Sequence, residues 1–516
     1  MKEIVTCSEM KELDGKTIRE MGVPSCVLME RAALKTVEEM EKDFTDHEHV
    51  LVVCGSGNNG GDGIAIARLL HLKGIPVEIF LAGDEKRMTE DTTLQYKIAA
   101  NYRVPFVNNP RWNEYTTIVD AIFGVGLQRD VEGKYYQLIR QMNEAHARKV
   151  AVDIPSGVNG DNGREMGIAF LADLTVTFAF RKRGLCFYPG RMYAGRTVVA
   201  DIGIYGGKNK VNQTWHLERK DMKRLPERVA YGNKGTFGKV LLVAGSEGMC
   251  GAAFLSGAAS FAAGAGMVKI QTVEENRIPL QTLLPEAIVS CAFNEEENEK
   301  ALDWCDVIVI GPGLGMSGKS RERAQWFLSR GHSAGKPVIA DADTLNLLAM
   351  YPEWRKYLGE KMIVTPHLGE MSRLCGRSIG EIQNTMAETA AEFSRETGAV
   401  CVLKDACTVI TDAVGNTCLN LSGNAGMGTA GSGDVLSGVL AAVCCMYLPY
   451  PETAPDMGMQ AALGVYLHGI AGDMAAKKLG MHGMTARDII RMLPEALKKE
   501  VEANGRIQDG GNHERA

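Results

Sequence analysis

Three loops in the N-terminal part of the chain carry side chains with oxygen atoms suited to acid–base chemistry or cation binding. Asn59 and Asp62 follow the apolar run HVLVVC, Asp120 ends the run TTIVD, and Asp153 and Ser156 end the run KVAVDIPS. In open parallel sheets, ligands bind beyond the carboxyl ends of the strands, so these loops are expected to converge. Carboxylate, amide and hydroxyl oxygens suit a hard cation, and Asp153 could serve as an acid or a base. A single aspartate at a strand end more often caps a helix, but three of them favour a site.

The stretch GSGNNG, from Gly55 to Gly60, matches the pattern GxGxxG and lies between a predicted strand and a predicted helix. With Asp84 after the next strand, this pattern alone would indicate an NAD-dependent dehydrogenase. Asp62 argues against it, because a carboxylate beside the loop would repel a bound pyrophosphate. The glycines could also do no more than allow a tight turn.

A second glycine-rich helix start, GTAGSGDVLSG, places Gly431, Gly433 and Asp434 together. Free backbone N–H groups at a helix start attract anions, and an aspartate there could take a proton from a substrate hydroxyl. The alternative is that Asp434 only interacts favourably with the helix dipole.

The stretch GLGMSGKS, Gly313 to Ser320, fits the P-loop pattern GxxxxGK[ST] after a predicted strand. So short a pattern often matches by chance. We interpret it as incidental and expect Lys319 to lie in solvent at the start of a surface helix.

Positioning these residues requires alternating strands and helices. The runs VLVVC, VEIFLAG, TTIVDAIFG, KVAVDIPSG and DLTVTFAF are short and apolar, as in a parallel sheet covered on both faces. The pattern restarts after the polar segment Trp215–Arg228 with GKVLLVAGS, GMVKIQTV, DVIVIGPGLG, PVIADAD, KMIVTPHLGE and AVCVLKD. The sequence therefore predicts an α/β protein with a Rossmann-like, doubly wound N-terminal domain and a second α/β domain.

Composition excludes several classes of protein. The 516 residues carry a net charge of −6, without the basic face that nucleic-acid binding requires. The densest basic cluster, Arg181–Arg183, is either a solvated loop or a phosphate contact. The N-terminus has no apolar signal region, and no 18-residue apolar run is present, so neither secretion nor a membrane is expected. Thirteen cysteines without a CxxC pair suggest reduced thiols and a cytoplasmic location.

The N-terminal motifs together resemble the NAD(P)H-hydrate epimerases of the YjeF N-terminal family. LMERAA, GSGNNGGDGIAIARLL, VDAIFGVGLQRDVEG and VDIPSGVNG carry the similarity, which spans roughly residues 1 to 215. Ala33 stands where the family usually has glycine. The resemblance implies a catalytic Asp153 and a potassium ion on Asn59, Asp120 and Ser156. It further implies that the nucleotide contacts Asn58, Asn59, Gly60, Gly61, Asp62, Gly124, Val125, Gly126, Leu127, Gln128, Arg129, Asp130 and Asp153.

The C-terminal motifs resemble the ribokinase-like NAD(P)H-hydrate dehydratases, over about residues 227 to 500. GTAGSGDVLSG, TPHLGE, LKDACT, DADTLNLL and RVAYGNKGTFGKVLLVAGS carry the similarity. The chain departs from the family pattern at Asp405, where KGxxT is usual, and at Asn233, where HKG is usual. The resemblance implies that Asp434 is the base. It places the hydrate on Ala253, Gly313, His367 and Asp434, and the phosphate donor on Lys404, Asp405, Ala406, Cys407, Thr408 and Gly433.

These resemblances imply a bifunctional enzyme that repairs hydrated NADH and NADPH. The expected organisation is an epimerase over residues 1–217, a linker over 218–226, a dehydratase over 227–505 and a disordered tail over 506–516. The epimerase interconverts the R and S hydrates. The dehydratase restores the S form through a phosphorylated intermediate, with ADP or ATP as co-substrate together with Mg²⁺. A homo-oligomer is expected. The alternatives are a ribokinase-like vitamin or sugar kinase fused to a dinucleotide-binding domain, and a non-catalytic nucleotide sensor.

Overall fold

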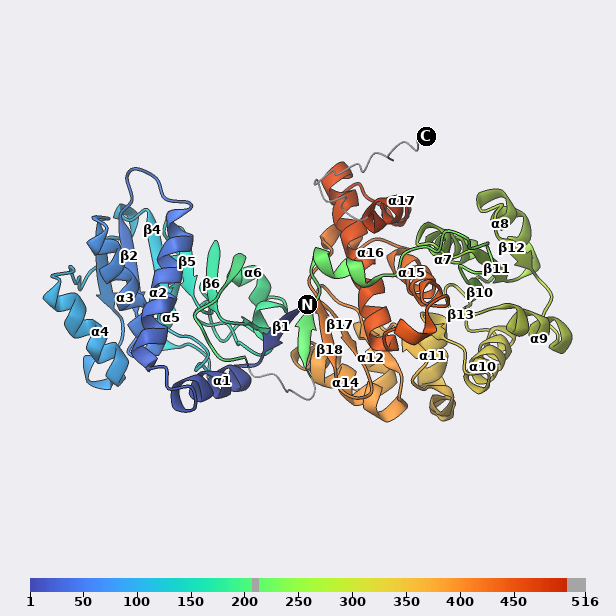
Figure 1. The fold of residues 1–516 in the computed structure, drawn as a ribbon, viewed down its shortest axis with the longest axis horizontal. Coiled ribbons are helices and arrows are strands. Elements are labelled where there is room, and N and C mark those ends of the chain that lie inside the picture. Colours follow the sequence, from blue (N-terminus) through green and yellow to red (C-terminus); the bar gives the residue numbers. More distant parts are fainter. Residues whose placement is uncertain (207–212, 499–516) are drawn as a thin grey trace, which may run out of the picture. The chain divides into compact units, whose positions relative to one another are not determined.

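A computed structural model describes residues 1–206 and 213–498, and the predicted tail 506–516 lies outside this range. The chain forms two compact units (Figure 1). Unit 1 comprises Met1–Leu217, Leu358–Glu360 and Val364–Leu421. Unit 2 comprises Glu218–Tyr357, Lys361–Ile363 and the residues from Ser422 onward.

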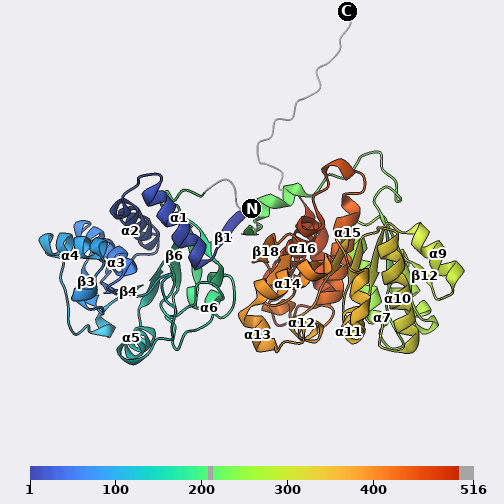
Figure 2. The same cartoon turned by 90° about the horizontal axis from the view of Figure 1, so that it is seen from below.

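A six-stranded sheet forms the centre of the N-terminal part of unit 1, and all its strands are parallel, as the sequence predicts. Figure 2 shows α2 and α3 on one face of this sheet and α5 on the other. In spatial order the strands are β3 (Val77–Leu81), β2 (Val50–Cys54), β4 (Thr117–Ala121), β5 (Arg148–Val152), β6 (Leu174–Phe178) and β8 (Arg196–Ala200). The helices of unit 1 are α1 (Cys7–Arg19), α2 (Ser25–Glu41), α3 (Asn58–Leu72), α4 (Glu90–Asn101), α5 (Gly133–Glu144), α6 (Gly190–Ala194), α12 (Leu368–Cys375), α13 (Ile379–Asn384) and α14 (Met386–Thr397).

Every residue of strand β2 is apolar, because helices cover both faces of the sheet. Val50, Val52 and Cys54 pack into one core cluster, with side chains of α2, α3 and α4. Leu51 and Val53 point the other way, into a cluster with side chains of α5. Successive side chains of a strand face opposite sides, so a sheet covered twice needs apolar residues at every position.

Unit 1 also contains a strand order that the sequence did not indicate: β16, β17, β18, β9, β1, β7. Strands β16 (Val400–Leu403), β17 (Thr408–Thr411) and β18 (Thr417–Asn420) are antiparallel neighbours. Strand β9 (Thr214–His216) pairs with β18 and with β1 (Lys2–Val5), which also pairs with β7 (Arg181–Lys182). The polar segment that begins at Trp215 thus opens inside a strand rather than in a loop.

Unit 2 holds five parallel strands in the order β12 (Ile288–Ser290), β11 (Met267–Gln271), β10 (Lys239–Val243), β13 (Val307–Ile310) and β14 (Val338–Ala340). Strand β15 (Met362–Val364) lies in the segment where the chain passes between units. The 3₁₀-helix η4 (Arg219–Arg224) occupies most of the predicted linker 218–226. The helices are α7 (Cys250–Ala262), α8 (Arg277–Leu283), α9 (Glu295–Trp304), α10 (Gly318–Ser333), α11 (Asp343–Met350), α15 (Ser432–Met446), α16 (Met457–Leu479) and α17 (Ala486–Leu497).

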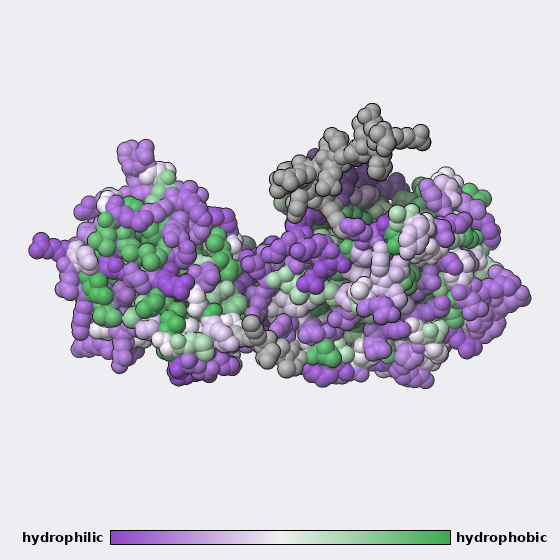
Figure 3. Space-filling model, viewed as in Figure 1, coloured by the Kyte–Doolittle hydropathy of each residue, from purple (hydrophilic) through white to green (hydrophobic). Residues whose placement is uncertain are grey.

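Hydrophilic residues dominate the face of the molecule drawn in Figure 3, with apolar residues in scattered patches. Across the described residues, no helix is long and apolar enough to span a membrane. All thirteen cysteines are free thiols, as the absence of a spacing pattern predicted.

Candidate active sites

The glycine-rich stretch after β2 runs from a short turn, Gly55 to Gly57, into the first turn of a helix, as the sequence predicts. Helix α3 begins at Asn58, and its N-cap, Gly57, provides no side-chain hydrogen bond to the free N–H groups. A Cβ on Gly60 would lie 1.9 Å from the carbonyl oxygen of Gly55, so only glycine fits there. The helix start is therefore pressed against the preceding strand end with N–H groups available to a ligand.

Asp120, at the end of β4, is fully buried and bonded to Ser156. The Ser156 N–H donates to Oδ2 of Asp120 at 2.7 Å, and the Ser156 hydroxyl donates to Oδ1 at 2.6 Å. The N–H of Ile122 adds a bond of 3.2 Å to Oδ1. Burial raises the pKa of Asp120 to about 6, although the bonds from Ser156 act in the opposite direction. The structure thus joins two of the residues that the sequence grouped into one site.

Asn59 lies next to the loop after β4, because a Cβ on Gly124 would be 3.6 Å from its Oδ1. Its Nδ2 is buried and has no hydrogen-bond partner among the described residues. A bound cation would account for this unsatisfied donor. If the Asn59 amide is flipped, its oxygen takes the place of Nδ2 and can coordinate the cation. The described residues contain no cluster of three His, Cys, Asp or Glu ligands. Amide, hydroxyl and carboxylate oxygens, as on Asn59, Ser156 and Asp120, are donors that suit a hard cation.

Asp153 follows β5 with a left-handed backbone, at φ 67°. Its Oδ1 accepts hydrogen bonds from Thr177 Oγ1 and Phe178 N, both at 3.1 Å, and from Lys182 Nζ. The side chain of Lys182 is 1% exposed and also donates to Thr177 Oγ1 and Phe178 O. Among the described residues, every hydrogen bond to this carboxylate goes to Oδ1. Oδ2 is left for a ligand.

Two further carboxylates belong to the same neighbourhood. Burial raises the pKa of Asp62 well above its usual range, and the charge of Asp153 raises it further. Asp14 of α1 behaves in the same way, for the same two reasons. Burial and nearby Asp161 and Asp153 raise the pKa of the Cys7 thiol to about 12. Lys182 is thus one cation among several acids, a composition typical of acid–base sites.

Lys182, Asp14 and Cys7 were not identified from the sequence. For Lys182, the interpretation of Arg181–Arg183 as a solvated loop is wrong, because the side chain is buried against Asp153. Buried lysine is rare unless it is paired. One sequence feature could have identified Lys182. It lies just after the apolar run TVTFAF, and a charged residue at the end of a buried strand indicates a partner of opposite charge.

Other N-terminal residues named from the sequence take surface positions. Gly126, Gln128, Arg129 and Asp130 are exposed, whereas Gly124, Val125 and Leu127 are half-buried. Asp84 accepts a hydrogen bond from the N–H of Lys86 at 3.0 Å and caps a short 3₁₀-helix. Asp84 is therefore a local cap and not a ribose contact of a dehydrogenase.

In unit 2, the residues named from the sequence lie at helix starts and strand ends. Asp434 is in the first turn of α15, after Gly431 at φ 88°. Its carbonyl oxygen accepts a hydrogen bond from Ser256 of α7 at 2.8 Å. Ala253 is buried one turn earlier in α7, and Gly313 packs against the start of the same helix, 2.9 Å from Ala252 if it bore a Cβ. Unit 2 therefore brings Ala253, Gly313 and Asp434 to one end of α7 and α15.

A buried aspartate that sequence reasoning missed supports this end of α15. Asp341 follows β14 and is 2% exposed. Its Oδ2 accepts a 2.6 Å hydrogen bond from Ser437, one turn into α15, and Ser437 also donates to the carbonyl of Gly433. This bond ties the second turn of α15 to the end of β14.

In unit 1, His367 and the segment from Lys404 to Thr408 lie side by side. His367 and Lys404 form a parallel bridge, and the N–H of Lys404 donates to Pro366 O at 2.8 Å. His367 caps α12, since its Nδ1 accepts from the N–H of Gly369 at 3.0 Å. Its side chain is 55% exposed, so it is not a core histidine. Asp405 and Ala406 are exposed at the β16–β17 turn, whereas the Cys407 side chain is buried, which leaves its backbone for contacts.

The P-loop pattern does not form a phosphate-binding loop. A side chain of the protein caps the helix that follows it. Ser317 caps α10, and its Oγ accepts from the N–H of Ser320 at 3.2 Å. Ser320 Oγ donates to Leu314 O, so this hydroxyl is turned toward the protein. Lys319 is exposed, as expected.

Comparisons with known proteins find two matched regions in this chain. A family model described as YjeF-related protein N-terminus matches residues 25–184, and one described as NAD(P)H-hydrate dehydratase matches residues 240–495. The bifunctional NAD(P)H-hydrate repair enzyme Nnr of Moorella thermoacetica is 37% identical and covers 97% of this chain and 98% of its own length. The NAD(P)H-hydrate epimerase of Oenococcus oeni is 50% identical over 39% of this chain and 97% of its own length.

Among solved structures, this chain is similar to the ADP/ATP-dependent NAD(P)H-hydrate dehydratase of Bacillus subtilis, co-crystallised with ATP/Mg²⁺. That protein is 30% identical, with a TM-score of 0.46, and covers 55% of this chain and 96% of its own. The similarity to the bifunctional relative extends over nearly the whole chain and includes both matched regions in one polypeptide. The chain belongs to the family of bifunctional NAD(P)H-hydrate repair enzymes.

Proposed function

We propose that this protein repairs hydrated NADH and NADPH through two activities. One epimerises the R and S hydrates, and the other dehydrates the S form at the expense of ADP or ATP. The observation that carries the proposal is the end-to-end similarity to bifunctional relatives, since both matched regions retain their strand-end and helix-start aspartates. The protein acts in the cytoplasm, which its thirteen free thiols support.

In the epimerase, Asp153 exchanges a proton with the substrate through Oδ2. Lys182, Thr177 and Phe178 hold Oδ1 and thereby fix the orientation of the carboxylate. Lys182 is a positioning residue, because its buried ammonium group bonds to Oδ1 and leaves Oδ2 toward the ligand. The nucleotide is bound by the start of α3, Asn58 to Asp62, and by the loop from Gly124 to Asp130.

Asn59, Asp120 and Ser156 would hold a potassium ion in this domain. The orphaned amide nitrogen of Asn59 and the buried carboxylate of Asp120 support this assignment. When bound, the ion supplies positive charge that helps to bind the phosphates of the nucleotide. Titration of the metal-free protein with KCl, followed by thermal unfolding, should raise Tm more than titration with NaCl does.

In the dehydratase, Asp434 takes the proton of the C6 hydroxyl as that oxygen attacks the terminal phosphate of ADP or ATP, and AMP or ADP leaves. Phosphate then leaves C6 and a proton leaves C5, which restores the double bond of the dihydropyridine ring. Mg²⁺ would accompany the phosphates of the donor. Lys404 to Thr408 and Gly433 bind the phosphate donor, while Ala253, Gly313 and His367 bind the hydrate. No side chain caps the start of α15, and its glycine-rich first turn carries the positive end of the helix dipole, which supports phosphate binding there.

The domain bounds follow from the same assignment: epimerase 1–217, linker 218–226 and dehydratase 227–505. A homo-oligomer is also proposed. The apolar side chains of Ile278, Leu283 and Ile288, exposed around the edge strand β12, support it.

The test is recovery of NADH absorbance from a mixture of R and S hydrates. With protein and ADP or ATP, both hydrates should be restored completely. A stable phosphoester without recovered absorbance would instead identify a kinase, and no turnover would identify a nucleotide sensor. Residues 1–217 expressed alone should still interconvert the two hydrates. This experiment tests whether the epimerase domain ends at residue 217.

A further inference from the structure

Unit 2 contains a cavity of about 850 Å³ that neither proposed activity uses. Gly264, just after α7, and Cys445 and Met446, at the end of α15, contribute to its lining. Asp434 lies at the other end of α15. Since an α-helix rises 1.5 Å per residue, Asp434 and Cys445 are roughly 16 Å apart along the axis. The cavity is thus separate from the helix start that carries the proposed base.

The size and lining of this cavity suit a small molecule. Pockets for small ligands typically measure about 300–1,000 Å³ and are mostly apolar with a few polar groups. The segment after the first unit folds over the ends of α15 and α17, held by Tyr447 OH on Arg224 O and Tyr450 OH on Glu227 O, both at 2.9 Å. The apolar part of the lining includes Met222, Leu225, Val229, Phe237, Met446 and Pro449.

The charged part of the lining is mostly cationic. Five basic side chains face one carboxylate, that of Glu227. Three of the five are engaged within the protein. Arg219 donates to the carbonyls of Ala496 at 2.7 Å and Lys498 at 3.1 Å, and so caps the negative end of α17. Lys220 pairs with Glu218, and Lys498 pairs with Glu495.

The remaining two cations, Lys223 and Arg228, form no ion pair or hydrogen bond through their side chains with any residue between 213 and 498. The guanidinium carbon of Arg228 lies 3.7 Å from the centre of the Phe237 ring. Stacking holds the guanidinium plane and leaves its edge N–H groups free to donate to an anion. The cavity therefore combines an apolar lining with a pre-oriented, unused donor.

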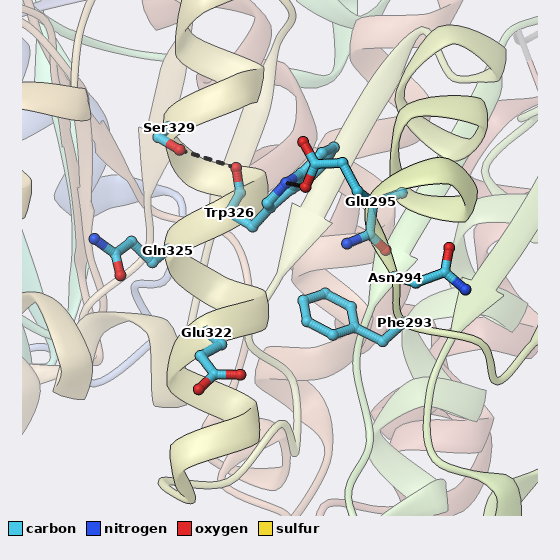
Figure 4. Close-up of a pocket in the computed structure, with 8 residues that line it drawn as sticks. Phe293, Asn294, Glu295, Glu322, Gln325, Trp326 and Ser329 are labelled. Atoms are coloured by element: carbon cyan, nitrogen blue, oxygen red, sulfur yellow. Dashed lines mark hydrogen bonds between the residues drawn. The ribbon is translucent and has the colours of Figure 1, made fainter.

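A second hollow in unit 2 lacks this combination. It measures about 360 Å³ and lies between the start of α9 and α10 (Figure 4). There Trp326 Nε1 already donates to Glu295 at 3.0 Å, and Ser329 Oγ donates to Trp326 O at 3.0 Å. Its charged lining groups, Glu295 and Glu322, are acidic. An anion would be repelled there.

We propose that the cavity between η4 and the ends of α7, α15 and α17 is a second small-molecule site of this protein. Its ligand is an organic anion with an apolar or aromatic body and one carboxylate, sulfonate or phosphate group. The body fills the space lined by Met222, Phe237 and Met446. Arg228 and Lys223 bind the anionic group.

Anilinonaphthalene sulfonate is a suitable probe, because it joins an aromatic body to a single sulfonate. Its fluorescence should rise saturably with the full-length protein, and saturating ATP should not displace it. The double variant Arg228→Ala, Lys223→Ala should weaken binding roughly ten-fold, because two charge-assisted contacts are lost. Uncharged phenylnaphthylamine should bind the variant and the unmodified protein equally.

Arg321→Ala is the matched control, since Arg321 also stacks on an aromatic ring of unit 2, that of Tyr351, outside the cavity. It should leave probe affinity unchanged, and NADH recovery should be unchanged in both variants. Equal affinity for the double variant and the unmodified protein would overturn the proposal, as would displacement of the probe by ATP. Binding that appears only after residues 499–516 are deleted would also overturn it, since the chain's own end would then be the occupant.

Discussion

The two proposed catalytic aspartates, Asp153 and Asp434, are held by different physical means. Asp153 is fixed by a buried ammonium group, a hydroxyl and a backbone N–H, on a residue with left-handed backbone. Asp434 lies in the first turn of α15, where the helix start supplies the favourable field. In the first arrangement a side chain from another part of the chain bonds directly to the carboxylate. In the second, the carboxylate lies in the first turn of its own helix, and residues from other segments hold the helix. Substitutions at the two positions should therefore differ in how far they disturb the fold.

The largest expected effect is that of Asp434→Asn on dehydration. Loss of a general base typically costs about 10²–10⁴-fold in rate. Because asparagine is still tolerated in the first turn of a helix, folding and nucleotide binding should survive. NADH recovery from pure S hydrate measures the rate, and Asp303→Asn, an exposed aspartate of α9, is the control. A rate within threefold of the unmodified enzyme would remove Asp434 from the mechanism.

Asp153→Asn should stop epimerisation and leave consumption of the S hydrate intact, with a loss of about 10²-fold or more in the epimerisation rate. Asparagine is the appropriate replacement because it tolerates the left-handed backbone better than alanine does. On pure R hydrate the variant should stall, and on pure S hydrate it should proceed normally. Equal loss on both hydrates would indicate a folding defect.

Lys182→Met should lower the stability of the protein, because it removes one partner of the buried Lys182–Asp153 ion pair. Removing one partner of a buried ion pair leaves an uncompensated charge, typically at a cost of about 3–5 kcal/mol in stability. Urea unfolding should show this loss. The double variant Lys182→Met, Asp153→Asn should regain most of the stability but no epimerisation. If the double variant is as unstable as the single one, the lysine stabilises the fold by packing and not by charge.

The smallest expected effect is that of Lys319→Ala. A P-loop lysine neutralises transferring phosphates, and its loss would be large. Here Lys319 is exposed on α10, so dehydration should stay within a few-fold of the unmodified rate. A collapse of nucleotide-dependent turnover, with an unchanged circular dichroism spectrum, would mean that the phosphate donor binds at Gly313–Ser320.

The sequence by itself determined the strand–helix alternation around the parallel strands β2, β3, β4, β5 and β6 of unit 1 and β10, β11, β13 and β14 of unit 2. These strands are largely apolar runs long enough for one crossing of a sheet, and a glycine-rich turn marks where a helix starts close to a strand. Asp120 and Ser156 could be placed together for the same reason, because parallel strands end at a common edge. These properties depend on short stretches of chain, so side-chain spacing predicts them.

Only the tertiary structure decided which charged residues are buried and which segments pair as strands. RKR reads as a surface segment, yet Lys182 is buried because Asp153, which is distant in sequence, compensates its charge. The same holds for Trp215, whose polar surroundings suggested a junction, but which lies in β9 between β1 and β18. The burial of a charge and the pairing of an isolated strand depend on partners that come from other parts of the chain. No local pattern contains that information, because the stabilising group is supplied only when the fold brings the two segments together.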